Sequence, residues 1–193
     1  EKYINQVAKK GMLNYFGYQR FGHDGAENLE KAKKYIYGDY SIKDRKLSKM
    51  LVAAYQSDFF NKWLVERLNM SEDSFKALDG DVFRVYETDR FFTPKNLTEA
   101  MEKDFKAKKI VPSGLLPGRK AFRAIGKAKE IEEKYDDTYI QEKGYRRDAL
   151  VYPSDINIKY NKETQKCKVR FTLPKGSYAT VLIENIANRN LKA

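Results

Sequence analysis

The sequence contains few of the residues that form covalent cross-links and metal sites. Its 193 residues include one cysteine, Cys167, and one histidine, His23. A single cysteine excludes an internal disulfide framework, and these two residues are too few for zinc sites built from Cys or His clusters. No apolar run approaches the roughly 18 residues that cross a bilayer, and the first residues lack the apolar core of a signal peptide. We therefore expect a reduced protein of the cytoplasm.

Acidic residues are missing from one long stretch of the chain. The protein has 38 Lys and Arg against 27 Asp and Glu, which leaves a formal net charge of +11. Residues 105–129 contain no acidic residue. The basic residues of this stretch are Lys106, Lys108, Lys109, Arg119, Lys120, Arg123, Lys127 and Lys129. Because a stretch of one sign lacks internal opposite-charge pairs, it indicates a polyanionic partner such as nucleic acid; a surface that only keeps the protein soluble is the alternative.

Aromatic residues are plentiful, at 13% of the chain, and the apolar residues suffice for a core. Apolar residues three or four positions apart predict one long helix over residues 47–68. Shorter helical patterns cover residues 1–10, 28–37, 97–108, 128–142 and 177–188, and Gly11 is the predicted stop of the first of them. Alternation predicts a strand at 81–86 and a hairpin formed by 156–160 and 169–173, and glycines and prolines indicate a structured loop at 112–118. This mixture predicts an α+β fold.

A glycine-punctuated aromatic segment at residues 14–22 is the strongest candidate binding site, since the sequence lacks a Gly-rich phosphate loop, a dinucleotide fingerprint and a His-Glu-x-x-His motif. Phe16 and Phe21 offer rings on which an unstacked base can lie. The amide of Asn14 can bond a base edge or hold a carboxylate, and Arg20 can bind a phosphate or a carboxylate. The same residues also fit the end of a buried strand, where the aromatic rings fill the core.

Four stretches in order resemble one enzyme family. Residues 14–22 read Asn-Tyr-Phe-Gly-Tyr-Gln-Arg-Phe-Gly and are similar to the Asn-x-Phe-Gly-x-Gln-Arg-Phe-Gly signature of the TruD family of tRNA pseudouridine synthases. Residues 54–61, followed by Arg67, resemble its Gln-Ser-x-x-Phe-Asn helix. Residues 112–118 resemble the Pro-Thr-Gly-Pro-Leu-Pro-Gly loop of its insertion. Residues 171–180 resemble its Phe-x-Leu-Pro-x-Gly-Ser-Tyr-Ala-Thr ending, so the resemblance covers nearly the whole chain.

The resemblance implies a pseudouridine synthase domain, residues 1–79 and 148–193, interrupted by the family's insertion subdomain, residues 80–147. Enzymes of this family flip out a uridine at position thirteen, in the D-arm region of tRNA. They break its glycosidic bond, rotate the uracil and rejoin it through carbon five. An aspartate carries the chemistry, and the resemblance implies that neither a metal nor a cofactor is needed.

The resemblance also assigns residues. Asn14 would position the catalytic aspartate or the flipped nucleotide, and Phe16 would stack on the uracil, because a flipped base has lost its stacking partners. Gln19, Arg20 and Phe21 complete the predicted substrate site. The predicted RNA contacts outside it are Lys106, Lys108, Lys109, Arg119, Lys120 and Arg123.

One feature of the family is missing from its expected place. The catalytic aspartate stands in a Gly-x-Lys-Asp motif upstream of the signature, but none of the 13 residues before Asn14 is an aspartate. Asp44 follows Ile42 and Lys43 without the glycine, and we interpret it as a surface residue. We therefore expect the chain to correspond to the C-terminal portion of the enzyme, to bind tRNA without isomerising uridine, and to need the N-terminal part as its partner. The alternative function is a non-catalytic basic RNA-binding module.

Overall fold

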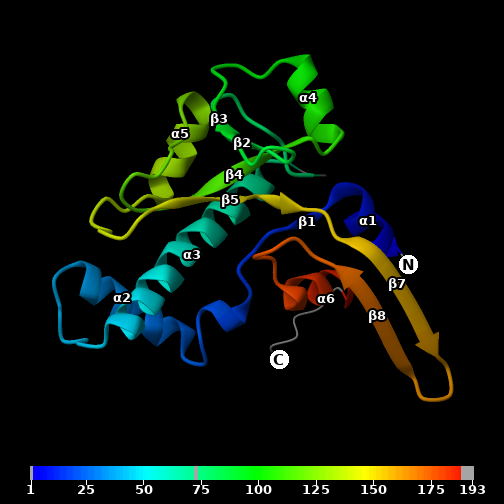
Figure 1. Ribbon diagram of the computed structural model, residues 1–193, viewed down its shortest axis with the longest axis horizontal. Coiled ribbons are helices and arrows are strands. Elements are labelled where there is room, and N and C mark those ends of the chain that lie inside the picture. The colour runs from blue at the N-terminus through cyan, green and yellow to red at the C-terminus, as the bar shows by residue number, and fades with distance from the viewer. Residues whose placement is uncertain (1, 72–73, 188–193) are drawn as a thin grey trace. The chain divides into compact units, whose positions relative to one another are not determined.

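The structure is a computed structural model that describes residues 2–71 and 74–187 (Figure 1). The chain divides into two compact units, and each is described by itself: Tyr15–Ala149 forms the larger unit, and Glu1–Asn14 with Leu150–Ala193 forms the smaller. The larger unit contains η1 (Tyr18–Arg20), α2 (Gly25–Ile36), α3 (Arg45–Asn69), β2 (Val82–Val85), β3 (Phe91–Phe92), α4 (Glu99–Lys106), β4 (Ile110–Leu116), α5 (Gly126–Glu132), η2 (Glu133–Tyr135) and β5 (Tyr145–Asp148). The smaller unit contains α1 (Lys2–Lys10), β1 (Met12–Leu13), β6 (Leu150–Val151), β7 (Ser154–Asn161), β8 (Lys166–Thr172) and α6 (Ala179–Ala187).

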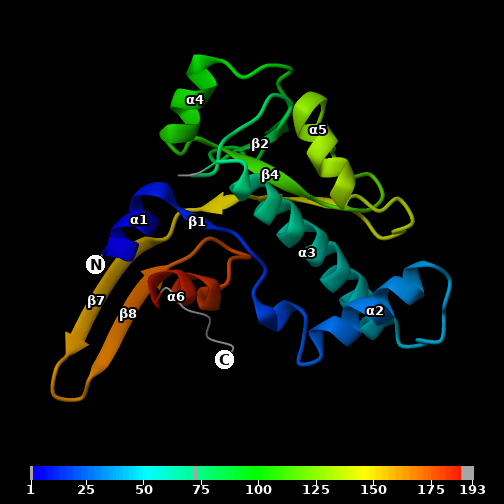
Figure 2. The same cartoon turned by 180° about the vertical axis from the view of Figure 1, so that it is seen from behind.

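The larger unit is built on an antiparallel sheet with the strand order β3-β2-β4-β5. Successive side chains of β4 point to opposite faces of this sheet. Gly114 faces the rings of Trp63 on α3, whereas Ser113 bonds Arg146, whose guanidinium pairs with Glu132 of α5. The helices α3 and α5 therefore cover opposite faces, and α2 packs along α3, as Figures 1 and 2 show. The mixed helices and antiparallel strands confirm the predicted α+β class.

The long helix α3 forms where the apolar spacing predicts it, and it begins at a side-chain cap. Asp44 is exposed, and its carboxylate accepts hydrogen bonds from the backbone N–H groups of Lys46 (2.7 Å) and Leu47 (3.2 Å). These N–H groups have no partner inside the helix, so the carboxylate stabilises its first turn. Asp44 is thus a surface residue, as the sequence analysis expected, and it caps the N-terminus of α3.

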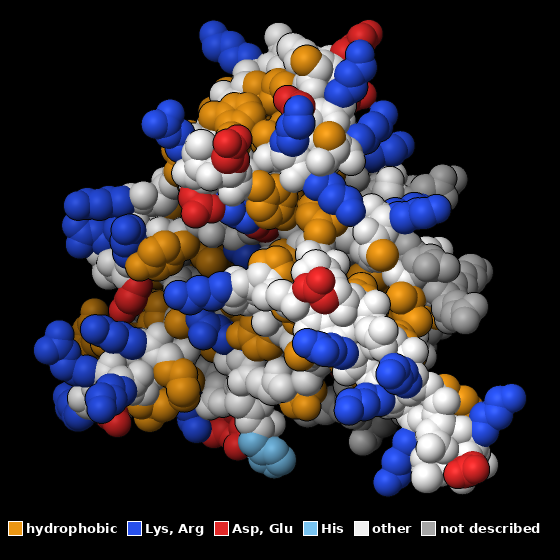
Figure 3. All heavy atoms as spheres, turned by 45° about the vertical axis from the view of Figure 1, so that its right-hand side comes forward, with side chains coloured by type: hydrophobic (Ala, Val, Ile, Leu, Met, Phe, Trp, Pro, Cys, Tyr) orange, Lys and Arg blue, Asp and Glu red, His pale blue; other side chains and the backbone are white. Residues whose placement is uncertain are grey.

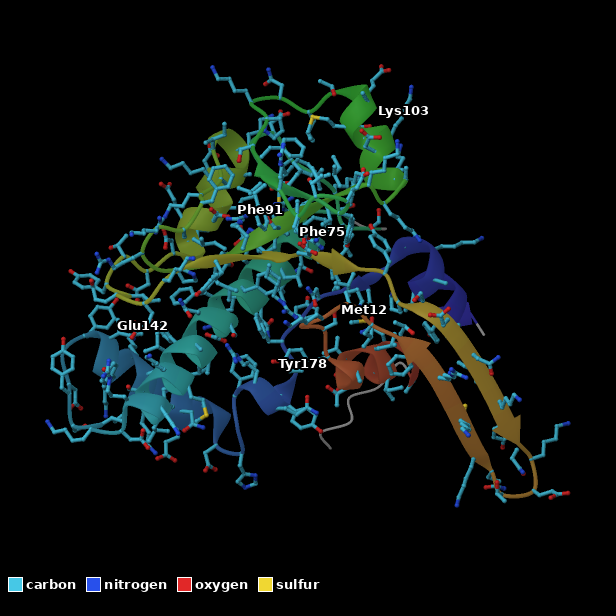
Figure 4. The ribbon with its side chains drawn as sticks, in the orientation of Figure 1. Met12, Phe75, Phe91, Lys103, Glu142 and Tyr178 are labelled. Carbon is cyan, nitrogen blue, oxygen red and sulfur yellow. The ribbon has the colours of Figure 1, made fainter. Side chains whose placement is uncertain are left out.

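The core of the larger unit depends on a close approach between α3 and β4. Phe60, Trp63 and Leu64 of α3 are buried, and the Phe60 and Trp63 rings lie 5.7 Å apart between centroids. A Cβ added to Gly114 would lie 2.4 Å from the Trp63 ring and 2.9 Å from the Phe60 ring. Phe75, labelled in Figure 4, extends this cluster, with its ring 6.1 Å from that of Trp63. The missing side chain at 114 is what lets the helix pack this closely.

The smaller unit contains the predicted hairpin. The strands β7 and β8 pair in antiparallel register from Asn157 opposite Arg170 to Asn161 opposite Lys166. In the intervening turn, the N–H of Thr164 donates to the side-chain oxygen of Asn161. A short pair of strands, β1 with β6, and contacts between α1 and α6 complete this unit. Gly11 has a φ of +78° and ends α1, as its position after the helical pattern predicts.

Two sequence-based assignments are wrong. Residues 112–118 were expected to be a loop, but residues 112–116 belong to β4, the strand between β2 and β5. Pro112 is tolerated there because its carbonyl accepts from Ala149, which follows β5, so its missing N–H lies where this pairing ends. The helix expected over 128–142 ends earlier, since α5 gives way to η2 and the chain then extends at Asp136.

The predicted closing helix forms as α6, and Asn188 at its expected end lies outside the described residues. The chain passes from one compact unit to the other between residues 14 and 15 and again between residues 149 and 150. These boundaries do not coincide with the predicted division, which lies between residues 79 and 80 and between residues 147 and 148. The assignment of residues 80–147 to an inserted subdomain therefore stays a prediction. No helix among the described residues is long and apolar enough to cross a membrane.

We expect Gly114→Ala to destabilise the protein by about 1–3 kcal/mol, the usual cost of overpacking a core. The added methyl group would collide with the Trp63 ring, at carbon atoms that phenylalanine lacks. The cost should therefore fall in a Trp63→Phe background, although that substitution is itself destabilising. Urea unfolding followed by far-ultraviolet circular dichroism of the four proteins measures the coupling. Equal costs of Gly114→Ala in both backgrounds would contradict this packing.

Candidate nucleic-acid interface

The backbone of Phe16 is bound on both sides by one side chain of α3. The N–H of Phe16 donates to Oδ1 of Asn61 at 2.9 Å, and Nδ2 of Asn61 donates to the carbonyl of Phe16 at 3.0 Å. An amide side chain carries one acceptor and two donors, so Asn61 can bond both the N–H and the carbonyl of Phe16, as a neighbouring strand would. The aromatic segment is neither regular strand nor free loop here, because α3 fixes its position.

The ring of Phe16 lies among cations and aromatic side chains. The guanidinium carbon of Arg147, on β5, is 3.9 Å from the ring centroid, and that of Arg20 is 5.4 Å away. The ring of Phe60 meets it edge-on at 5.7 Å. Gly114 stands directly opposite Arg147 in the sheet, so both lie on the face covered by α3. A half-buried phenyl ring flanked by two guanidinium groups can bind a flat base and an anion together.

The other predicted substrate residues occupy different positions. Arg20 donates from Nε to the hydroxyl of Ser57 (3.0 Å) and from an Nη atom to the carbonyl of Ala53 (3.3 Å), which fixes its guanidinium against α3. Gln19 is exposed in η1. Phe21 is half-buried, and its carbonyl accepts from Nδ2 of Asn28.

Asn14 is the last residue of the first of the two segments that form the smaller unit, and it is buried. The structure thus brings Phe16 and Arg20 together on α3 within the larger unit. Gln19 and Phe21 are positioned nearby only through the same segment of chain, and Asn14 belongs to the unit that is described separately.

Gln56 ties two loops to the middle of α3. Its buried side-chain amide donates to the carbonyls of Pro117 (2.7 Å) and Lys143 (3.2 Å). The same loops are joined by their backbones, because the N–H of Arg119 bonds the carbonyl of Glu142 and the N–H of Gly144 bonds that of Arg119. Residues 117–120 and 142–144 therefore lie side by side.

Three basic residues of the acid-free stretch, residues 105–129, pair with carboxylates that lie outside that stretch. Lys109 pairs with Asp104 at 3.2 Å, Arg123 with Asp136 at 2.7 Å, and Lys129 with Glu133 at 3.3 Å. Hydrogen bonding to Asp136 raises the pKa of Arg123. The sequence argument that a one-sign stretch forgoes such pairs is wrong for these residues, because folding brings in acidic neighbours from the flanking segments.

Exposed basic and aromatic side chains remain around the joined loops. Arg119, Lys120 and Lys143 are exposed, as are Phe122 and Tyr145, and the ammonium of Lys143 lies 5.2 Å from the centre of the Tyr145 ring. Lys106 ends α4 and is exposed, and Lys108 follows it with a φ of +61°. Figure 3 shows one face of the molecule, where Lys and Arg side chains outnumber carboxylates and exposed hydrophobic groups lie between them. We call the set Arg119, Lys120, Phe122, Lys143 and Tyr145 the loop patch.

A buried carboxylate anchors the segment that leads into the loop patch. Oδ2 of Asp137 accepts from the hydroxyls of Tyr37 (3.1 Å) and Tyr55 (3.4 Å), and Oδ1 accepts from the N–H of Tyr139. Burial and the nearby carboxylate raise the pKa of both phenols, which keeps them as neutral donors. The rings of Tyr37 and Tyr139 lie 4.9 Å apart on the surface. Among the described residues, no three His, Cys, Asp or Glu side chains gather as a metal site.

The roles of three residues at the site were missed from the sequence. Asn61 and Ser57 stood in a recognised motif, but nothing in a helical pattern tells which polar side chain reaches another segment. Arg147 lies on β5, where three of four residues are charged, so no alternation of apolar residues marked it as a strand. Only the pairing of β5 with β4 places its guanidinium over Phe16.

Replacing Asn61 by leucine should loosen the Phe16 segment. Leucine removes both hydrogen bonds between Asn61 and Phe16. Each corresponds to about 0.5–1.5 kcal/mol, so we expect the Phe16 amide proton to exchange roughly fivefold faster or more. Asn61→Asp is the matched control, because a carboxylate still accepts from the Phe16 N–H. Hydrogen exchange read by NMR at that amide measures both. Unchanged exchange in Asn61→Leu would show that α3 does not hold the segment.

Comparison with known proteins gives the family. The model of the family described as tRNA pseudouridine synthase D (TruD) matches residues 26–186. A relative from a Nitratiruptor species, named tRNA pseudouridine synthase D, is 37% identical over 99% of this chain and 61% of its own length. One from Wolinella succinogenes with the same name is 36% identical over 98% of this chain and 60% of its own. The chain spans about 60% of the length of these curated relatives.

A solved structure shares the fold. The putative tRNA pseudouridine synthase D (TruD) of Methanosarcina mazei superposes with a TM-score of 0.68 at 20% identity, covering 97% of this chain and 63% of that one. At this sequence identity, the structural similarity shows a shared fold and nothing more. The family match and the curated relatives extend along nearly the whole sequence, and on that ground the chain belongs to the TruD family of tRNA pseudouridine synthases.

Proposed function

We propose that the protein of which this chain forms a part isomerises a uridine of tRNA to pseudouridine in the cytoplasm, at position thirteen in the D-arm region. The observation that carries the proposal is the ring of Phe16, which Asn61 fixes through the backbone and which two guanidinium groups flank. A uridine flipped out of an RNA helix needs a stacking surface for its base and cations for its phosphates. Family membership supplies the reaction.

The reaction is a rearrangement without net loss of atoms. The bond between N1 of uracil and C1′ of ribose breaks, the base turns, and a bond forms between C5 and C1′. C5 then gives up its proton, and N1 carries one in the product. The aspartate expected to carry this chemistry stands in a Gly-x-Lys-Asp motif, which does not occur in these 193 residues. We therefore expect this chain by itself to bind tRNA without converting it.

The loop patch extends the proposed RNA surface beyond the flipped base. Its two exposed cations Arg119 and Lys120 follow the end of β4, and Phe122 and Tyr145 expose rings beside them. Arg123 belongs to the originally predicted contacts, but its guanidinium already pairs with Asp136. Of these three residues, Arg119 and Lys120 are thus better candidates for phosphate contacts than Arg123.

Salt dependence tests this surface. Each phosphate neutralised on a single strand contributes about −0.7 to the slope of log affinity against log salt, and on a duplex about −0.9. Replacing Arg119 and Lys120 together by alanine should flatten the slope by roughly 1.4–1.8 if both contact phosphates. Arg123→Ala, which removes a paired cation, should change it by less than half as much. Filter binding of tRNA at a series of salt concentrations gives the slopes, and an unchanged slope for the double variant leaves these residues a solubilising surface.

Phe16→Ala should affect the chemistry more than the affinity for tRNA. Many phosphate contacts hold the tRNA, whereas the ring contributes only after the base has flipped. A base on an aromatic ring gains about 1–3 kcal/mol. Losing about 2 kcal/mol from the flipped state lowers the rate roughly thirtyfold. Asn14→Ala should also lower the rate more than the affinity. Asn14 is expected to position the catalytic aspartate or the flipped nucleotide, and small misplacements of a reacting group are costly.

The measurement is single-turnover conversion of tRNA by the protein in its full natural length, beside equilibrium binding of the same tRNA. Phe91→Ala is a matched control, since Phe91 is an exposed phenylalanine of β3. A tenfold loss of affinity with an unchanged rate would make Phe16 an ordinary RNA contact. Tight tRNA binding with no conversion by the full-length protein would favour the non-catalytic RNA-binding module.

A further inference from the structure

The two faces of the hairpin formed by β7 and β8 differ in their chemistry (Figure 1). On one face, Ile158 is paired with Val169, and both side chains are half-buried. The side chains of the other face are exposed and line a hollow of about 520 Å³; we call this set, which consists of Asp155, Asn157, Lys159, Lys168, Arg170 and Thr172, the hairpin face. An antiparallel pair of strands with one apolar and one polar face packs on the apolar face, which leaves the hairpin face accessible.

Two lysines stand directly opposite each other on the hairpin face. Lys159 of β7 is paired with Lys168 of β8, and two residues further along, Arg170 is paired with Asn157. Directly opposed side chains have Cβ atoms about 5 Å apart, and like charges in that position destabilise a sheet. Among the described residues, the side chains of these three cations form no ion pair and no hydrogen bond. The hairpin thus holds three uncompensated cations close together at a cost in stability.

The chemistry of the hairpin face suits a ligand with closely spaced negative charges. A guanidinium binds two phosphate oxygens at once, and an ammonium neutralises a phosphate as a point charge. The carboxylate of the hairpin face, on Asp155, accepts a hydrogen bond from the hydroxyl of Ser154 at 3.0 Å. None of the six side chains is aromatic, whereas Phe122 and Tyr145 lie beside the cations of the loop patch. Cations without aromatic rings contact the phosphate backbone of a nucleic acid and do not stack on its bases.

We propose that the hairpin face is a further RNA-binding site of the protein and binds the phosphate backbone of tRNA without reading its sequence. The phosphates bring the negative charge that Lys159 and Lys168 lack in the free protein, so binding relieves the repulsion between them. Duplex RNA suits such a face, because side chains cannot read the deep, narrow major groove of an A-form helix, whereas its phosphates are accessible. This inference rests on the proposed function and adds to it a tRNA contact on the smaller unit.

Reversing one charge of the lysine pair tests the site with little risk to the fold. In Lys168→Glu the new carboxylate stands opposite Lys159, and opposite charges in that position stabilise a sheet. The melting temperature of the full-length protein should therefore stay the same or rise. The slope of log tRNA affinity against log salt should flatten by about 1.4–1.8, because one phosphate contact is lost and Lys159 becomes paired. The variant should thus lose roughly tenfold less affinity than the wild type between 50 and 200 mM salt.

Lys162→Glu is the matched control. Lys162 is exposed in the turn of the same hairpin and is not among the residues that line the hollow. Because both variants change the net charge equally, a general loss of attraction to RNA would flatten both slopes alike. We expect the slope of Lys162→Glu to change by less than half as much. Single-turnover conversion at saturating protein should change by less than about threefold in either variant, since the hairpin face contributes to binding and not to the reaction.

Chemical footprinting shows directly what covers the hairpin face. The lysines of the full-length protein are acetylated with and without tRNA, and the modified peptides are quantified by mass spectrometry. We expect tRNA to slow acetylation of Lys159 and Lys168 about threefold or more and to leave Lys162 unchanged. If Lys159 and Lys168 are already protected without tRNA, another part of the protein or a second copy covers the hairpin face, and the inference is overturned.

The outcomes separate this inference from the proposed function. Equal salt slopes for the wild type and Lys168→Glu, or equal changes in Lys168→Glu and Lys162→Glu, would overturn the inference and leave the proposed function untouched. If Lys168→Glu melts at a lower temperature, Lys168→Gln decides, since loss of one phosphate contact flattens the slope by about 0.7–0.9 and a purely structural role leaves it unchanged. If the wild type binds tRNA with both lysines protected but does not convert it, the proposed function fails and the hairpin site remains.

Discussion

The close contact between α3 and Gly114 is the interaction on which the larger unit depends. Because position 114 has no side chain, the rings of Phe60 and Trp63 lie directly against β4. This contact sets the depth and the direction of the helix, and polar residues along the helix then meet their partners. Gln56 reaches the loop carbonyls of Pro117 and Lys143, and one turn further on Asn61 reaches Phe16.

Two buried ion pairs lie on the two faces of the same sheet. At the far end of α3, Arg67 donates to both carboxylate oxygens of Asp81 and lies over the rings of Trp63 and Phe75. On the other face of the sheet, Arg146 pairs with Glu132 at 2.5 Å and bonds Ser113. Breaking a buried pair by removing one partner costs far more than an exposed pair contributes. A candidate binding site that rests on such a helix is held rigidly, which is what positioning a reacting base requires.

The spacing of apolar residues and the positions of glycine and proline predicted much of the fold, because both reflect the local backbone preferences of the chain. The stripe of α3, the hairpin of β7 and β8 and the end of α1 at Gly11 follow from the spacing of apolar residues and from one glycine. Residues 112–118 were misread because proline and glycine usually break strands. Here the sheet places Pro112 beside the end of β5 and uses Gly114 for packing. The motifs identified the segment around Phe16, but Arg147 could not be found from the sequence, since its contact arises only from strand pairing.

The central claim is that the target uracil lies on Phe16, and photochemical cross-linking from that base tests it most directly. A tRNA with 4-thiouridine at position thirteen is bound to the full-length protein and irradiated, and the attached peptide is identified by mass spectrometry. The account predicts a cross-link within the Phe16 segment or at Arg147, and its loss when Phe16 is replaced by alanine. A cross-link confined to the loop patch, unaffected by Phe16→Ala, would contradict it.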